Sequence, residues 1–145
     1  MLTEHIDFVG SLAMHQAGVT IMAGTDSPMP GVYPGYALHE EMALLVASGL
    51  TPREALRSAT LTPAQFLGIA ATTGSVAVGK RADLVLLDAD PTRDIRNTRR
   101  IDTVVIDGRL LRQGVLDSVL EEVARAQNAV TRSDSRTCYF YTYSD

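Results

Sequence analysis

The chain has 145 residues, of which 46% are hydrophobic and 21% are charged, and its formal net charge is −4. This composition is typical of one globular domain or two small ones, and it excludes a disordered chain. The negative charge gives no electrostatic basis for binding nucleic acid or an anionic membrane, and no apolar run approaches the roughly 20 residues of a membrane span. The N-terminal residues lack the pattern of a signal peptide, and the single cysteine, Cys138, cannot form an internal disulfide. We therefore expect a cytoplasmic protein.

The first 72 residues have the pattern of an α/β protein. A helix is predicted over residues 3–17, ended by Gly18, and the apolar run "VTIMAG" (19–24) then predicts a strand buried on both faces. Residues 26–36, "DSPMPGVYPGY", hold three prolines and two glycines and are predicted to form a long loop. A second helix is expected from about residue 38 to residue 48.

Two further helices are expected to start at capping boxes. In "TPRE" (51–54) and "TPAQ" (62–65), a threonine at the N-cap is followed by proline at the first helical position and by glutamate or glutamine at the third. The second of these helices is predicted to end at Gly68.

The pattern changes near residue 72. Strands are predicted around 75–78 and 82–88, and the pair Asp107-Gly108 between apolar runs at 103–106 and 109–111 predicts a type I′ hairpin. A last helix is expected over 116–130, followed by a tyrosine-rich tail that could add an edge strand or contact a partner. We therefore expect three regions, 1–72, 73–112 and 113–145.

Asp26 is the first candidate site residue. A carboxylate at the C-terminal end of a buried parallel strand lies at the rim where α/β proteins place their sites, and its oxygen could bind a divalent metal or take a proton from metal-bound water. The alternative is an Asx turn, which the neighbouring glycine, serine and proline also favour and which needs no ligand.

The other candidates are His39, Tyr33 and Tyr36, which could contact a substrate or support the site from the loop and the helix after Asp26. Each has a structural alternative, because histidines beside an apolar stripe and aromatic residues in loops often serve packing. The sequence contains no H-x-H, H-E-x-x-H or C-x-x-C, so no local spacing predicts a complete metal site.

Four segments together resemble the C-terminal portion of metal-dependent amidohydrolases, in the branch of imidazolonepropionases and Xaa-Pro dipeptidase-like enzymes. They are "AGTDS" (23–27), "ALHEEMALLVASGLTPREALRSATLTPAQFLG" (37–68), "GSVAVGKRADLVLLDADP" (74–91) and "IDTVVIDGRLL" (101–111). The resemblance implies the C-terminal part of a (β/α)8 barrel in residues 1–72, followed by one segment of a small composite β-sandwich in 73–112. It also implies that Asp26 takes the place of the aspartate that ends the last barrel strand, binds the metal and activates water.

The resemblance further implies a hydrolase that acts on C–N bonds of a small-molecule cyclic or peptide-like amide, with a divalent metal, zinc in the complete enzyme. The family's H-x-H, its lysine or glutamate and its further histidines have no counterpart in this chain, which resembles a fragment. We therefore expect the isolated chain to be inactive unless it self-associates or binds a partner that covers its exposed strand edges. The alternative function is a non-catalytic module that folds and oligomerises without metal.

Overall fold

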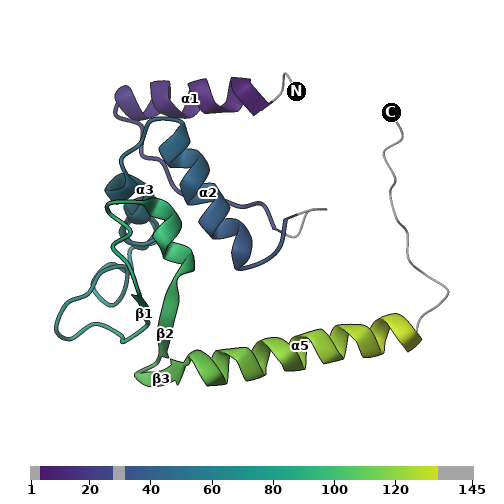
Figure 1. Ribbon diagram of the computed structural model, residues 1–145. Helices are drawn as coiled ribbons and strands as arrows, with labels where there is room; N and C mark the ends of the chain where they lie inside the picture. Colours follow the sequence, from purple (N-terminus) through teal and green to yellow (C-terminus); the bar gives the residue numbers. More distant parts are fainter. Residues whose placement is uncertain (1–3, 28–31, 134–145) are drawn as a thin grey trace, which may run out of the picture. The chain divides into compact units, whose positions relative to one another are not determined.

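The computed structural model describes residues 4–27 and 32–133 (Figure 1). The chain divides into two compact units, Met1–Leu110 and Leu111–Asp145. The elements of the first unit are α1 (Glu4–Gln16), α2 (Tyr36–Ala47), α3 (Pro52–Ser58), α4 (Leu61–Phe66), β1 (Leu84–Leu87), the 3₁₀ helix η1 (Ile95–Arg99) and β2 (Ile101–Ile106). Strand β3 (Arg109–Arg112) crosses the boundary between the units, and α5 (Gln113–Ser133) belongs to the second unit.

The core of the first unit forms where α2, α3 and η1 meet. Helix α2 packs against both α3 and η1, and α1 contacts α2 near one end (Figure 1). The buried side chains at this junction are Met42, Leu45, Leu50, Ala55 and Ile95. Short helices gain most of their stability from such packing, because isolated helices of this length are marginal in water.

The sheet is small and antiparallel, with strand order β1-β2-β3. In the β1–β2 ladder Leu84 lies opposite Val105, and the register shifts between Leu86 and Leu87. Asp107 and Gly108 both have positive φ, 50° and 77°, as the two central residues of a type I′ turn require. The hairpin predicted at this pair is confirmed.

Most helix predictions are confirmed, but the second capping box is wrong. The first box is present: the Thr51 hydroxyl accepts the Glu54 N–H, and the Glu54 carboxylate accepts the Thr51 N–H. Helix α4 instead begins at Leu61 with Thr60 at its N-cap. Thr62 therefore lies inside the first turn, where Pro63 is tolerated because the N–H that it lacks has no intrahelical acceptor there.

The strand predicted at residues 19–24 is wrong in its burial and its pairing. The segment has no regular secondary structure, and it joins no ladder in the described part of the chain. Ile21 and Ala23 are half-buried against the core, whereas Val19 and Met22 are 49% and 39% exposed. A strand of a parallel sheet is buried on both faces only when helices and neighbouring strands surround it, and these described residues supply helices on one side.

The strand predicted at 75–78 is also wrong, because these residues form turns and irregular backbone, with Val76 and Val78 almost fully exposed. The Lys80 ammonium closes this loop by donating to the Ala70 carbonyl and the Ser75 hydroxyl. The change from helices to antiparallel strands after residue 72 agrees with the sequence pattern. Within the described ranges, no helix has both the length and the hydropathy needed to cross a membrane. The tyrosine-rich tail lies outside the described residues.

Candidate functional site

Asp26 follows residues 19–24, in which Ile21 and Ala23 pack against the core. It is exposed, and its φ of 50° is in the left-handed region, which aspartate tolerates better than most residues. This backbone conformation fits the turn interpretation, and the exposed carboxylate remains accessible to a ligand. The neighbouring Ser27 hydroxyl is buried and has no hydrogen-bond partner among the described residues.

Two consecutive backbone N–H groups hold the segment before Asp26. The Ala23 N–H donates to the Ser58 carbonyl at 3.0 Å, and the Gly24 N–H donates to Glu41 Oε1 at 3.5 Å. These acceptors come from α3 and α2. Sequence reasoning missed Glu41, because nothing in its local pattern shows that residues 19–24 fold back beside α2.

His39 faces η1. Its Nδ1 lies 3.0 Å from Thr98 Oγ1, and Thr98 donates its only hydroxyl proton to the Ile95 carbonyl at 2.8 Å. The His39 Nδ1–H must therefore be the donor to Thr98, which leaves the lone pair of the neutral ring on Nε2. Burial, and secondarily the Arg99 guanidinium, lower the pKa of His39, which favours this neutral form.

The end of α2 that carries Tyr36 also contacts η1. The Arg99 guanidinium carbon lies 4.9 Å from the centre of the Tyr36 ring, and Arg99 pairs with Glu40 at 3.8 Å. Tyr33 is 70% exposed, and its backbone carbonyl accepts the Ala37 N–H at the start of α2. Tyr36 and His39 are thus brought together at η1, and in the described ranges no hydrogen bond or ion pair connects either with Asp26.

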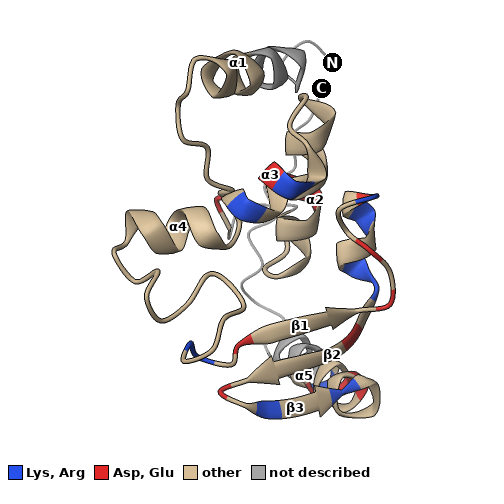
Figure 2. Cartoon of the chain, turned by 90° about the vertical axis from the view of Figure 1, so that its left-hand side faces the viewer, with Lys and Arg blue, Asp and Glu red and all other residues tan. Residues whose placement is uncertain are grey.

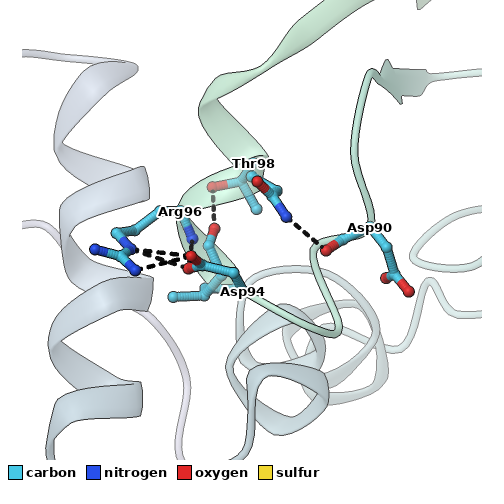
Figure 3. Close-up of polar contacts among 6 residues, drawn as sticks. Asp90, Asp94, Arg96 and Thr98 are labelled. Carbon is cyan, nitrogen blue, oxygen red and sulfur yellow. Dashed lines mark hydrogen bonds and ion pairs between the residues drawn. The ribbon is translucent and has the colours of Figure 1, made fainter.

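Helix η1 is itself fixed by local polar contacts (Figure 3). The Asp94 carboxylate accepts the Arg96 N–H at the N-cap and pairs with the Arg96 guanidinium at 2.9 Å. These bonds to Arg96 hold the pKa of Asp94 below its usual range. The Asn97 side chain donates to the Asp90 carbonyl at 2.8 Å. This bond helps to hold the turn that carries Thr98, the partner of His39.

The described residues do not fit a complete metal site. No group of three or more histidine, cysteine, aspartate or glutamate side chains is placed to hold a metal ion within those residues. Protein metal sites need about three or four ligands from the chain, each oriented by further hydrogen bonds. Asp26 therefore supplies one potential ligand without the others.

Comparison with known proteins places this arrangement in a family. Residues 10–111 match the amidohydrolase family. The chain is 36% identical to imidazolonepropionase of Shouchella clausii (strain KSM-K16) over 106 residues, which are 70% of this chain and 24% of that protein. The chain thus spans about a quarter of the length of this curated relative.

Solved structures agree. A Xaa-Pro dipeptidase with methionine bound in its active site superposes with a TM-score of 0.65 at 32% identity, covering 72% of this chain and 25% of the other. An amidohydrolase from Thermotoga maritima MSB8 gives a TM-score of 0.61 at 28% identity, covering 73% and 26%. The first unit is therefore a mixed α/β piece of the amidohydrolase fold, and the chain belongs to the amidohydrolase family.

Proposed function

We propose that this chain is the C-terminal part of a metal-dependent hydrolase that cleaves C–N bonds in a small cyclic or peptide-like amide. Its helical residues up to 72 would complete a (β/α)8 barrel, and residues 73–112 would form part of a composite β-sandwich. The family match over residues 10–111, with Asp26 just after the apolar run at residues 19–24, carries the proposal. Asp26 would be the chain's contribution to a metal site, zinc in the complete enzyme, and His39, Tyr33 and Tyr36 are the proposed supporting or substrate-contacting residues.

Apolar surface in the first unit supports the proposal that more protein packs there. A groove of about 1000 Å³ runs between helices α2 and α4 and strand β1. Helix α4 and strand β1 line this groove, and neither contains a charged residue (Figure 2). Leu67 and Val85, which line the groove, are 65% and 55% exposed, and the neighbouring Phe66 is 74% exposed. Exposed apolar residues that gather in one place often mark a surface that packs against other protein.

Backbone without a neighbouring strand supports the same proposal. Strand β1 is at the edge of the sheet, and residues 19–24 have no strand beside them in the described chain. Unpaired strand edges favour association with another strand. We therefore propose that the isolated chain is inactive and that a second copy, or a partner supplying the missing strands, covers these edges.

A chimera tests the enzymatic proposal. In imidazolonepropionase of Shouchella clausii, the quarter of the protein that matches this chain is replaced by residues 10–111 of this chain. We expect the chimera to bind zinc and hydrolyse the relative's substrate, and we expect Asp26→Asn to abolish both, because asparagine keeps the backbone conformation but removes the anionic ligand.

Asp107→Asn is the matched control, since Asp107 is also exposed and has the same φ of 50°. This variant should retain zinc and turnover. A folded chimera that stays metal-free and inactive, or one in which Asp26→Asn behaves like Asp107→Asn, would contradict the proposal.

One observation favours the alternative of a non-catalytic module. Helix α5 lies outside the family match, and its Val115, Leu120 and Val123 are 47%, 67% and 52% exposed. An apolar stripe on a helix of this length is suited to packing against another helix. This function would be favoured if the full chain forms an inert oligomer without metal and the chimera is also inactive.

A further inference from the structure

We propose that Glu41 is a positioning residue that fixes the backbone leading to Asp26. Its Oε1 accepts the Gly24 N–H at 3.5 Å, two residues before the aspartate. Glu41 lies on α2 and is half-buried. Helix α2 is itself held in place, because Met42 and Leu45 are in the core. The functional meaning of this contact rests on the proposed role of Asp26.

The physical reason is the missing ladder. Gly24 lies in a segment that pairs with no strand in the described chain, so no ladder partner accepts its N–H, and Glu41 supplies the acceptor at this exposed position. Glu41 supplies a charged acceptor, and charge-assisted hydrogen bonds exceed neutral ones in strength at equal geometry. The distance of 3.5 Å is long, so most of the effect is attraction between the carboxylate and the N–H dipole.

The contact between Glu41 and Gly24 lies close enough along the chain to restrict the backbone at Asp26. The preceding N–H, of Ala23, donates to the Ser58 carbonyl at 3.0 Å, and Ala23 packs against the core. Glu41 extends this anchoring by one residue, leaving Thr25 between the fixed backbone and the left-handed turn at Asp26. Without Glu41 the last fixed point would be Ala23, and the Asp26 carboxylate would sample more directions.

Glu40 provides a matched control on the same helix. It has the same side chain as Glu41, but it faces η1 and pairs with Arg99 at 3.8 Å. A Glu40 substitution therefore changes the charge and the helix propensity of α2 equally, without touching the segment before Asp26.

The test is NMR on the full 145-residue chain, comparing wild type with Glu41→Ala, Glu41→Gln and Glu40→Ala. In Glu41→Ala we expect the Gly24 amide proton to exchange about three- to tenfold faster with solvent. We also expect the Cα chemical shift of Asp26 to move toward the value of a conformationally averaged backbone. The amide of Ala55, which donates to the Thr51 carbonyl in the core, should keep its exchange rate. Glu41→Gln keeps an acceptor oxygen but loses the charge, so it should restore only a minor part of the protection.

Unchanged Gly24 and Asp26 signals in Glu41→Ala, or equal changes in Glu40→Ala, would overturn the proposal. If Glu41→Ala does not fold, Glu41→Gln and Glu40→Gln carry the same comparison through the Gly24 amide proton shift, which should move upfield only when Glu41 loses its charge. The experiment needs neither metal nor substrate. Its failure is therefore distinct from failure of the chimera, which tests the role of Asp26.

Discussion

Among single residues, Asp26 and Asp107 adopt the same left-handed conformation in different surroundings. Asp107 sits in the hairpin turn, where its N–H donates to Asp83 Oδ1 at 2.8 Å, and this bond is the main reason that the pKa of Asp83 is lowered. Asp26 follows a segment held by α2 and α3. The same φ therefore serves a local turn at one position and accompanies a tertiary contact at the other.

Gly74 offers a prediction for a single residue. It has a φ of 83°, and an added Cβ would lie 2.6 Å from the Ala64 Cβ and 3.1 Å from the Thr60 carbonyl oxygen. We expect Gly74→Ala to reduce the free energy of unfolding by about 3 kcal/mol, from roughly 1–2 kcal/mol of backbone strain and a similar overpacking term. Urea denaturation measures this change.

Gly79→Ala is the control for Gly74→Ala. Its φ of 86° imposes the same strain, but its Cβ would meet no atom within 4 Å. We expect a loss of only about 1–2 kcal/mol. Equal losses at the two glycines would show that the contact with α4 does not constrain the loop.

Among the secondary-structure elements, two helices that follow similar sequences start in different ways. The Thr51 box caps α3, whereas the Thr60 hydroxyl at the start of α4 donates back to the Leu56 carbonyl at 2.7 Å. Only Ala59 and Thr60 separate the end of α3 from the start of α4, so the chain has already entered α4 before Thr62 can act as a cap. The spacing between neighbouring helices overrides the local signal.

Paired alanine variants test this difference. Thr51→Ala should reduce the free energy of unfolding by about 1 kcal/mol, because it removes the acceptor for the Glu54 N–H. Thr62→Ala should change it by less than about 0.5 kcal/mol, since alanine is a better helix former inside a first turn. Thermal or urea unfolding of both variants measures the contrast, and a larger loss at Thr62 would contradict the assigned start of α4.

The capping box also predicts a pH dependence. The hydroxyl and then the N–H of Thr51 lower the pKa of Glu54. A carboxyl with a lower pKa in the folded state contributes stability above its unfolded pKa and loses it as the pH falls through the folded pKa. Glu54→Gln retains a capping acceptor but does not titrate, so the advantage of wild type over this variant should shrink between about pH 7 and about pH 3.

Urea unfolding at both pH values measures this difference. The exposed Glu121, which pairs with Arg125 one turn along α5, provides the comparison variant Glu121→Gln. We expect a weaker pH dependence there, because exposed pairs contribute little. An advantage at Glu54 that grows as the pH falls would be the wrong sign.

For the chain as a whole, the exposed apolar groove and the unpaired strand edges support the same proposal, that more protein packs against the first unit. The residues that line the groove come from helices α2 and α4 and from strand β1, and Met42 of α2 also belongs to the core. The chain spans about a quarter of the curated relative from Shouchella clausii, so the proposed active site depends on protein beyond these residues. This is why the decisive test of function is the chimera, in which those residues are supplied.

Much of the local structure could be predicted from the sequence. Helix α1 with Gly18 after it, the Thr51 box and the Asp107-Gly108 turn follow from interactions within a few residues, and the structure confirms them. The strands predicted at 19–24 and 75–78 fail because a strand needs a partner, and an apolar run does not reveal whether that partner is present. Helix η1 was missed because it is short and packs against α2, a contact that its own sequence does not reveal, although its N-cap Asp94 is a local signal.

The order of the matching segments over residues 10–111 was enough to assign the family, and the same segments identified Asp26 as the residue to test. The groups that surround the candidates became known only from the folded chain: Thr98 fixes the tautomer of His39, and Glu41 reaches the backbone before Asp26. The physical reason is the separation along the chain of the residues that interact. Caps and turns are determined by neighbours along the chain, whereas a hydrogen bond between segments 17 or 59 residues apart exists only after the helices have packed.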